Sequence, residues 1–232
     1  MNQLIQFDSA EMLVAHEIDV SKLALKEQIE KIFELAALSL QKEGLGMNDI
    51  IYIIAEMSDM RDRPILNEAQ KVVWTDPKHY PCRIILERGG FKAGAGLRLM
   101  FTATKAPHVQ VTSLKGQVPT GPFARSSVVG KRVYGSGVRA IVPGTQNKVS
   151  DDLQECARQC LKNLAINMEE SGTDIKKAYS FVVYLTDLRD TPKVLEVFEE
   201  WKLSQSEVQL QFEYIDALNE YHDIEIACNA YL

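Results

Sequence analysis

Two side chains of this sequence carry reactive groups in strand-like surroundings. Arg83 begins an apolar run, and Glu225 stands between two isoleucines. A guanidinium offers a planar fork of donors that pairs a carboxylate in two places, and a carboxylate with a pKa near neutrality can take up or release a proton. A lone arginine on a strand is usually a surface residue, and a glutamate in an alternating strand usually faces solvent. By residue type alone, both are therefore only candidates.

Other residue types that often build active sites are scattered along the chain. The histidines and cysteines show no metal-ligand spacing, and there is no strand–GxxxxGK–helix phosphate loop. We therefore predict no metal site and no cofactor, and we interpret the cysteines as reduced core thiols. The histidines are His16, His79, His108 and His222, and the cysteines are Cys82, Cys156, Cys160 and Cys228.

The overall charge and the N-terminus narrow the class of protein. A net charge of −6 argues against nucleic acid as the main partner, because nucleic-acid binders usually carry a basic face. The first residues lack a basic segment followed by an apolar one, and no apolar run approaches the roughly 20 residues that span a bilayer. We expect a cytoplasmic protein that binds neither nucleic acid nor membrane.

The elements that must position the two candidates repeat along the chain. Apolar residues at helical spacing predict a helix over residues 25–44, and the same pattern returns over residues 152–172. Both segments end at a glycine suited to a helix C-cap, Gly44 and Gly172, 128 residues apart. This constant offset predicts an internal duplication.

The same offset continues downstream. Residues 51–55 are answered by 179–183 as predicted buried strands, residues 58–62 by 186–190 as turns, and residues 64–74 by 192–201 as short helices that begin at a proline. We predict an α+β fold of two tandem units, residues 1–108 and 116–232, each a mixed β-sheet with two helices packed on one face. The other sheet face needs cover as well, which implies packing between units. The joint is expected in residues 106–121, which are rich in Pro and Gly.

The second half resembles a known family in several short motifs. Residues 121–126 read Gly-Pro-Phe-Ala-Arg-Ser, and residues 133–137 read Val-Tyr-Gly-Ser-Gly. This opening is similar to that of the YjgF/Rid (reactive intermediate deaminase) family, which typically starts with Gly-Pro-Tyr-Ser followed by a strand ending in Ser-Gly. The first half resembles the family through residues 54–62, 67–68 and 80–83. The resemblance thus implies two chorismate mutase-like/YjgF-like units in tandem.

The resemblance carries expectations about activity and assembly. Members of the family are typically trimers with a site between adjacent subunits, where an Arg holds a substrate carboxylate. A Ser-Gly strand end, an aromatic residue and a Glu come from the neighbouring subunit. The reaction is hydrolysis of enamines or imines to ketones and ammonia. For this chain the resemblance implies a small carboxylate substrate and a homo-oligomer, a trimer or a hexamer.

The first half matches only the carboxylate-binding positions of the family. Arg83 and Asn67 stand at those positions, and the backbone N–H of Ile85 is a further donor if the strand edge is open. The family's Glu is replaced by Arg98, and no Ser-Gly strand end is present near residues 15–18. By the resemblance, this half cannot supply the other wall of a site.

The second half matches the complementary positions. Ser136, Gly137 and Glu225 fit the family pattern, with Phe123 where Tyr is usual, while the arginine position is lost in residues 206–209. We therefore predict one composite site, with Glu225 and Ser136 as catalytic residues. The predicted substrate-binding residues are Arg83, Asn67, Ile85, Gly137, Phe123, Arg98 and Arg139.

Three functions remain open. The first is a deaminase acting on an enamine or imine of a carboxylate, where Arg98, Arg125 or Arg139 would bind a second carboxylate of a substrate such as a 2-aminomuconate. The second is a chorismatase-like hydrolase of an enolpyruvyl ether, although chorismatases are usually longer chains. The third is a non-enzymatic protein that binds keto acids or other metabolites, because a fold does not fix a function.

Overall fold

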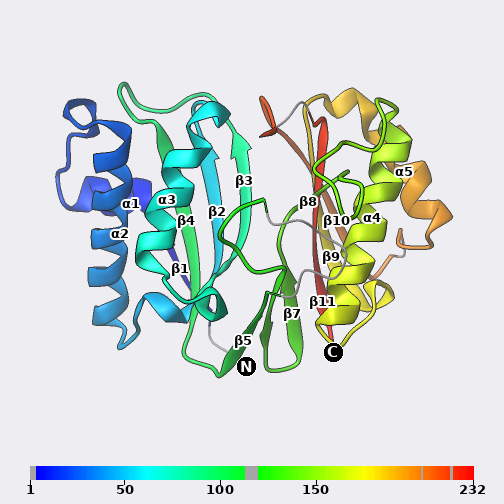
Figure 1. The fold of residues 1–232 in the computed structure, drawn as a ribbon, viewed down its shortest axis with the longest axis horizontal. Helices are drawn as coiled ribbons and strands as arrows, with labels where there is room; N and C mark the ends of the chain where they lie inside the picture. The colour runs from blue at the N-terminus through cyan, green and yellow to red at the C-terminus, as the bar shows by residue number, and fades with distance from the viewer. Residues whose placement is uncertain (1–3, 113–119, 205, 220–221) are drawn as a thin grey trace.

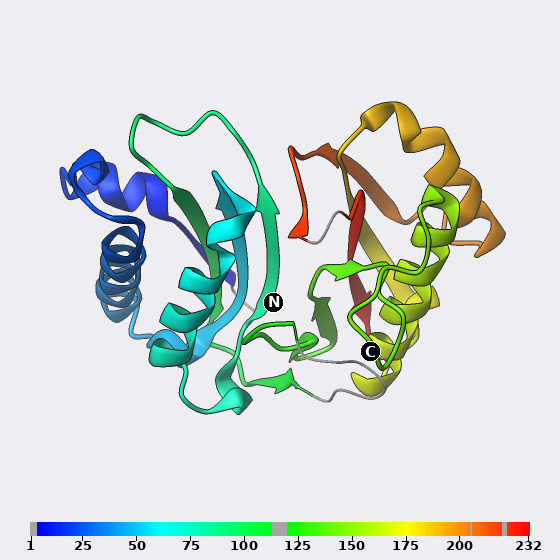
Figure 2. The same cartoon turned by 45° about the horizontal axis from the view of Figure 1, so that its top comes forward.

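The computed structural model describes residues 4–112, 120–204, 206–219 and 222–232. Two β-sheets face each other in the middle of the molecule, and the helices cover their outer sides (Figures 1 and 2). The helices are α1 Ser9–Ala15, α2 Leu25–Lys42, α3 Arg63–Val73, α4 Leu153–Glu170 and α5 Thr191–Glu200. The strands are β1 Leu4–Asp8, β2 Ile50–Met57, β3 Cys82–Glu87, β4 Leu97–Thr104, β5 His108–Val111, β6 Ser126–Val129, β7 Arg132–Gly135, β8 Val138–Arg139, β9 Ala178–Leu185, β10 Gln209–Tyr214 and β11 Ile224–Tyr231.

The first sheet has four strands in the order β1-β4-β2-β3. It is mixed as predicted, because β2 and β3 are parallel and the other neighbours are antiparallel. Its helical face buries one core with α2, the large side chains Phe33, Trp74 and Phe101 among them. The prediction of two helices was too low for this half, since α1 adds a third whose Met12 lies in the same core.

The second sheet joins β10-β9-β11-β7-β6-β5, with β8 paired to β11 beside this path. Strand β5 starts at His108 and pairs with β6, so the last residue predicted for the first unit already belongs to the second sheet. The chain crosses between the sheets at residues 105–107, at the start of the predicted joint. The part of that joint at residues 113–119, including the predicted domain start at 116, lies outside the described residues.

The helices and strands that were predicted in both halves at the constant offset are present in the structure. Helices α2 and α4 match the two long amphipathic patterns, and α3 and α5 each begin with proline in the first turn. The turn before each short helix has the same hydrogen bond, in which an aspartate accepts from the N–H two residues on: Asp59 from Arg61, and Asp187 from Arg189. These turns place α3 and α5 in the same way over their sheets.

A third apolar cluster joins the two halves where the sheets face each other. Ile84 and Leu86 of β3 pack with Tyr184 of β9 and Ala227 of β11. The expected packing between the inner sheet faces is therefore confirmed. Polar bonds cross the same junction, since the Tyr52 hydroxyl donates to the Gly135 carbonyl at 3.0 Å.

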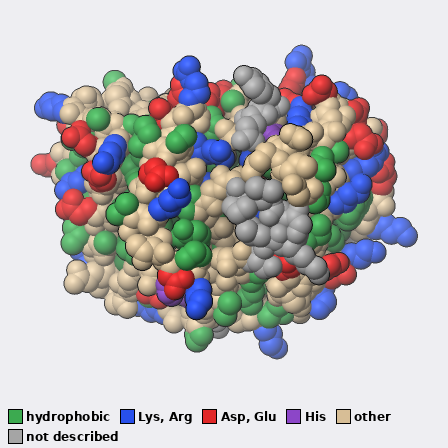
Figure 3. Space-filling model, in the orientation of Figure 1, with side chains coloured by type: hydrophobic (Ala, Val, Ile, Leu, Met, Phe, Trp, Pro, Cys, Tyr) green, Lys and Arg blue, Asp and Glu red, His purple; other side chains and the backbone are tan. Residues whose placement is uncertain are grey.

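The remaining expectations about chain chemistry concern cysteines, metals and membranes. The four cysteines are free and buried. Among the described residues, no group of three or more His, Cys, Asp and Glu side chains is arranged to hold a metal ion. Within the same residues, none of the helices combines the length and the hydrophobicity needed to cross a bilayer. Basic and acidic side chains are interspersed on the face shown in Figure 3.

Candidate functional site

A small cavity lies where β3 of the first half meets β11 of the second half. The two strands face each other across the junction in Figures 1 and 2. The cavity has a volume of about 30 Å³ and shares Thr120 and Phe123 with two adjoining cavities of about 40 and 200 Å³. Its lining comes from both halves and consists of Arg63, Arg83, Ile85, Thr120, Phe123, Gly137, Arg139, Asn219 and Glu225. The two candidates from sequence, Arg83 and Glu225, therefore lie on one cavity of one chain.

The side chain of Arg83 is oriented by helix α3. Its Nη1 donates to Oδ1 of Asn67 at 2.7 Å and also to Oε1 of Gln70. The guanidinium stacks on Phe123, with 4.9 Å from its central carbon to the ring centroid. Its Nη2 is buried and has no hydrogen-bond partner in the described part of the chain. Arg83 therefore keeps one donor nitrogen for an anion, while Asn67 acts by orienting it.

Burial also sets the electrostatics of this arginine. Desolvation lowers the pKa of the Arg83 guanidinium, and the like charge of Arg63 lowers it further, while Glu225 opposes the shift. A buried cation with an unpaired N–H is costly. Binding an anion would offset that cost, which is the behaviour expected of a carboxylate-binding group.

The Ser136-Gly137 strand end holds β3 in place. The Ser136 hydroxyl accepts from the backbone N–H of Arg83 at 2.9 Å and donates to the Ala124 carbonyl at 2.6 Å. The N–H of Gly137 donates to the Arg83 carbonyl at 3.1 Å. Ser136 is buried, and its hydroxyl proton is committed to Ala124. In the structure the hydroxyl positions β3 through these bonds, and the catalytic role of Ser136 stays a prediction.

Glu225 lies directly behind Gly137. A β-carbon on Gly137 would overlap Oε1 of Glu225, so glycine is required for the strand end to approach the carboxylate. Glu225 pairs in register with Arg139 of β8 and is 4% exposed. Desolvation raises its pKa to about 7, against the opposing charges of Arg139, Arg83 and Arg63. Both protonation states are therefore accessible near neutral pH.

The backbone of Ile85 offers a further donor. The backbone N–H groups of Arg83 and Glu87 point toward the second half. There they donate to the Ser136 hydroxyl and to the Ala217 carbonyl. Alternation along a strand puts the N–H of Ile85 on the same edge, between these two anchored points. Ile85 lines the cavity, so its N–H has the placement expected for a second contact to a substrate carboxylate.

Arg98 does not take part in this cavity. Its Nε donates to both carboxylate oxygens of Asp8, at 3.1 and 3.0 Å, and its Nη1 lies 3.5 Å from Glu56. It pairs in register with Glu56 on the sheet of the first half. Its sequence position matches that of a site residue, but its own sheet supplies two carboxylates. The prediction that Arg98 binds substrate is therefore replaced by an ion-pair role.

Sequence reasoning missed four residues around the site. Arg63, Thr120 and Asn219 line the cavity, and Gln70 bonds Arg83. Gln70 follows Asn67 by three residues in the predicted helix, and this spacing on one helix face was a usable signal. Thr120 and Asn219 lie in loops without a regular pattern, so only the folded chain brings them to the cavity.

Known proteins similar to this chain include two named deaminases. The chain is 27% identical over 134 residues to Reactive Intermediate Deaminase A, chloroplastic, of Arabidopsis thaliana, a match covering 58% of this chain and 71% of that protein. It is 26% identical over 91 residues to the 2-iminobutanoate/2-iminopropanoate deaminase of Homo sapiens, covering 39% and 66% respectively. Both names describe deaminases, and the human name gives 2-iminobutanoate and 2-iminopropanoate as the substrates of that protein.

A solved structure and a family profile complete the comparison. YyfA of Yersinia pestis, a protein of the conserved Rid family, matches with a TM-score of 0.50 at 20% identity, over 54% of this chain and 100% of its own. This likeness shows a shared fold. The profile of the Endoribonuclease L-PSP family matches residues 115–232, which confirms the resemblance seen in the second half. With half of its length matched, the chain belongs to the Endoribonuclease L-PSP family.

Proposed function

We propose that the cavity between β3 and β11 is the active site of a deaminase that hydrolyses an enamine or imine of a carboxylate. One observation carries the proposal: Glu225, with a pKa of about 7, lines the same cavity as Arg83, whose buried Nη2 has no hydrogen-bond partner among the described residues. The names of the related deaminases support the reaction class.

The proposed chemistry assigns a task to each group. Nη2 of Arg83 and the N–H of Ile85 hold the substrate carboxylate, which places the imine carbon toward Glu225. Ionised Glu225 takes a proton from water as the water oxygen bonds to that carbon. Glu225 returns that proton to the nitrogen, which gives a carbinolamine. Glu225 then takes the proton of the new hydroxyl group and passes it to the nitrogen as the C–N bond breaks and the C=O bond forms, so that a keto acid and ammonia leave. An enamine first gains a proton at carbon to become the imine.

The charge of the cavity favours an acidic substrate. Arg63, Arg83 and Arg139 face a single carboxylate, Glu225, in its lining. Opposite charge in a partly closed site raises the local concentration of an anionic ligand. We therefore propose a dicarboxylate, such as a 2-aminomuconate-like compound, as the narrower substrate class.

The organisation of the chain is proposed along with the reaction. We interpret the two halves as tandem units of one family, with the site composed of the carboxylate-binding part of the first and the proton-transferring part of the second. The constant 128-residue spacing and the matching turns at Asp59 and Asp187 support this. We also propose assembly into a homo-oligomer, a trimer or hexamer.

Ammonia release tests the proposal. Wild-type protein, Arg83→Met and Glu225→Gln are compared on 2-imino acids formed in situ and on 2-amino-dienoates. We expect Glu225→Gln to lose about 100- to 10,000-fold in kcat, the usual effect of removing a proton-transfer group. Arg83→Met is expected to raise KM and lower kcat/KM, because the carboxylate loses its charged partner.

Two exposed residues provide matched controls. Arg132→Met and Glu199→Gln remove the same groups from exposed positions and should keep wild-type rates. Wild-type rates in Arg83→Met or Glu225→Gln would contradict the site. Binding of keto acids without ammonia release from any substrate would favour the metabolite-binding alternative, and pyruvate release from chorismate would favour the chorismatase-like one.

A further inference from the structure

A second arginine, Arg125, is buried beside the site without a full set of partners. It is 7% exposed. Its backbone is fixed on both sides, because its N–H donates to Val111 at 2.7 Å and its carbonyl accepts from Ser136 at 2.9 Å. Burial lowers the pKa of its guanidinium, and the charge of Glu170 opposes the shift. The proposed reaction assigns no task to this residue.

The unpaired edge of Arg125 is the edge that binds carboxylates. Its Nε and Nη2 are buried and have no hydrogen-bond partner among the described residues. These two nitrogens point their N–H groups in parallel and form a bidentate fork. Elsewhere in this chain the same edge of Arg158 holds Glu200, at 2.8 Å from Nε and 2.7 Å from Nη2. Arg125 presents the same fork without its carboxylate.

Phe123 connects this fork to the proposed active site. The central carbon of Arg125 lies 5.5 Å from the ring centroid, and that of Arg83 lies 4.9 Å from it. The two guanidinium carbons are therefore at most 10.4 Å apart, the sum of these two distances. A separation of at most 10.4 Å is within the reach of a short ligand with an anionic group at each end.

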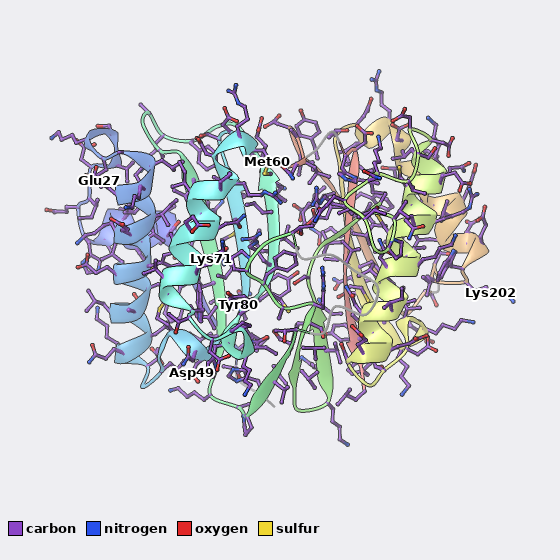
Figure 4. All side chains as sticks on the ribbon, in the orientation of Figure 1. Glu27, Asp49, Met60, Lys71, Tyr80 and Lys202 are labelled. Atoms are coloured by element: carbon purple, nitrogen blue, oxygen red, sulfur yellow. The ribbon has the colours of Figure 1, made fainter. Side chains whose placement is uncertain are left out.

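Cavities next to Arg125 share walls with the active-site cavity. One of about 40 Å³ contains Arg125 and Arg139 in its lining, and another of about 200 Å³ contains Arg125 and Tyr80. Both share Thr120 and Phe123 with the cavity of Arg83. Tyr80 lies two residues before β3, near the loops between the two halves (Figure 4). A ligand group held by Arg125 therefore has a place adjoining the site.

We infer that Arg125 binds the second carboxylate of a dicarboxylate substrate, through its Nε–Nη2 edge, while Arg83 holds the carboxylate next to the reacting carbon. The inference rests on the proposed function and adds the residue that selects the substrate class. Of the other two arginines considered for this role, Arg98 is paired with Asp8 and does not line these cavities, and Arg139 donates from Nη1 to the Asn219 carbonyl at 3.0 Å. The length of the preferred substrate follows from the Arg83–Arg125 separation.

Direct binding of unreactive dicarboxylates tests the inference without depending on catalysis. Malonate, succinate, glutarate and adipate are titrated by calorimetry against wild-type protein, each beside its monomethyl ester of equal length. We expect the best-fitting diacid to bind about 10- to 100-fold more tightly than its ester, as for one charge-assisted carboxylate contact. Arg125→Gln should abolish this preference, and Arg125→Lys should restore part of it, because lysine keeps the charge and loses the fork.

An exposed arginine serves as the control. Arg132→Gln removes the same group from β7 and should keep the full preference for diacids. Equal affinity of wild-type protein for a diacid and its ester at every length, or an unchanged preference in Arg125→Gln, would overturn the inference. A diacid preference in a protein that releases no ammonia would refute the deaminase proposal and leave the Arg125 subsite standing.

Thermal unfolding separates binding from a structural role. Without ligand, Arg125→Gln should unfold at the same temperature as wild type or higher, because it removes a buried charge with two unpaired nitrogens. Adipate or the best diacid should then stabilise wild type more than the variant. A marked fall in the unfolding temperature of the ligand-free variant would show instead that Arg125 supports the fold.

Discussion

At the scale of single residues, burial gives Glu225 and Arg83 their proposed chemistry. Glu225 ionises near neutral pH because the cavity removes it from water more than the nearby arginines compensate. In the part of the chain that the structure describes, Arg83 has two side-chain acceptors at Nη1 and none at Nη2, so its guanidinium is oriented and still able to bind an anion. Sequence indicates which residues can act, whereas the protonation state and the free donor depend on neighbours far away in the chain.

The raised pKa of Glu225 has a consequence for stability. Between about pH 4.5 and pH 7 the folded state holds a proton on Glu225 that the unfolded state has lost, so stability falls as pH rises through this window. The total effect is roughly 3 kcal/mol, from a pKa of about 7 in place of 4.5. Glu225→Gln removes this pH dependence. The free energy of unfolding of the variant should therefore rise relative to that of wild type between pH 4.5 and pH 8.

Urea unfolding at several pH values measures this difference. Glu199→Gln, at an exposed position, is the matched control and should follow the wild-type curve. Parallel pH profiles for wild type and Glu225→Gln would show that Glu225 ionises at its ordinary pKa in the folded protein.

At the scale of elements, one helix face and two strand ends build the site. Helix α3 presents Arg63, Asn67 and Gln70 at positions i, i+4 and i+7, which share one face. The two long helices, the two short helices and the strands β2 and β9 were predictable from the sequence, because each depends on local spacing and turn residues, whereas α1 was missed. The partners of Ser136 and Arg98 were not predictable from the sequence, because they come from other segments of the chain: Ala124 from the segment before β6, and Asp8 from β1.

A substitution at Gly137 tests the contact between the two strand ends. Its replacement by alanine would place a β-carbon against Oε1 of Glu225, and the carboxylate must move away. We expect Gly137→Ala to lower kcat by about 10-fold or more, as displacement of a proton-transfer group does, and to cost about 1–3 kcal/mol of stability through overpacking. Steady-state ammonia release and urea unfolding measure the two effects.

Gly46 provides the control for this substitution. A β-carbon there would meet only Oδ2 of Asp49 at 4.0 Å, an ordinary contact. Gly46→Ala should therefore leave both kcat and stability close to wild type. Normal turnover by Gly137→Ala would mean that Glu225 does not need its present position.

At the scale of the whole molecule, the two halves contribute different functional groups to one cavity. The first half supplies Arg83 and its supports, and the second supplies Glu225, Gly137 and Phe123. The apolar cluster between the sheets keeps these parts together within one chain. The resemblance indicated a composite site without deciding which chains form it, because chain pairing depends on packing rather than on motifs. In the structure both parts line the same cavity.

Mixing two inactive variants tests this central claim most directly. Arg83→Met and Glu225→Gln are each expected to be inactive in ammonia release, and unfolding together followed by joint refolding allows their chains to associate in any oligomer. If each chain builds its own site, every site in the mixture carries one of the two defects, and the mixture stays inactive. Recovery of a substantial fraction of wild-type activity in the mixture would contradict the account and place the site between chains.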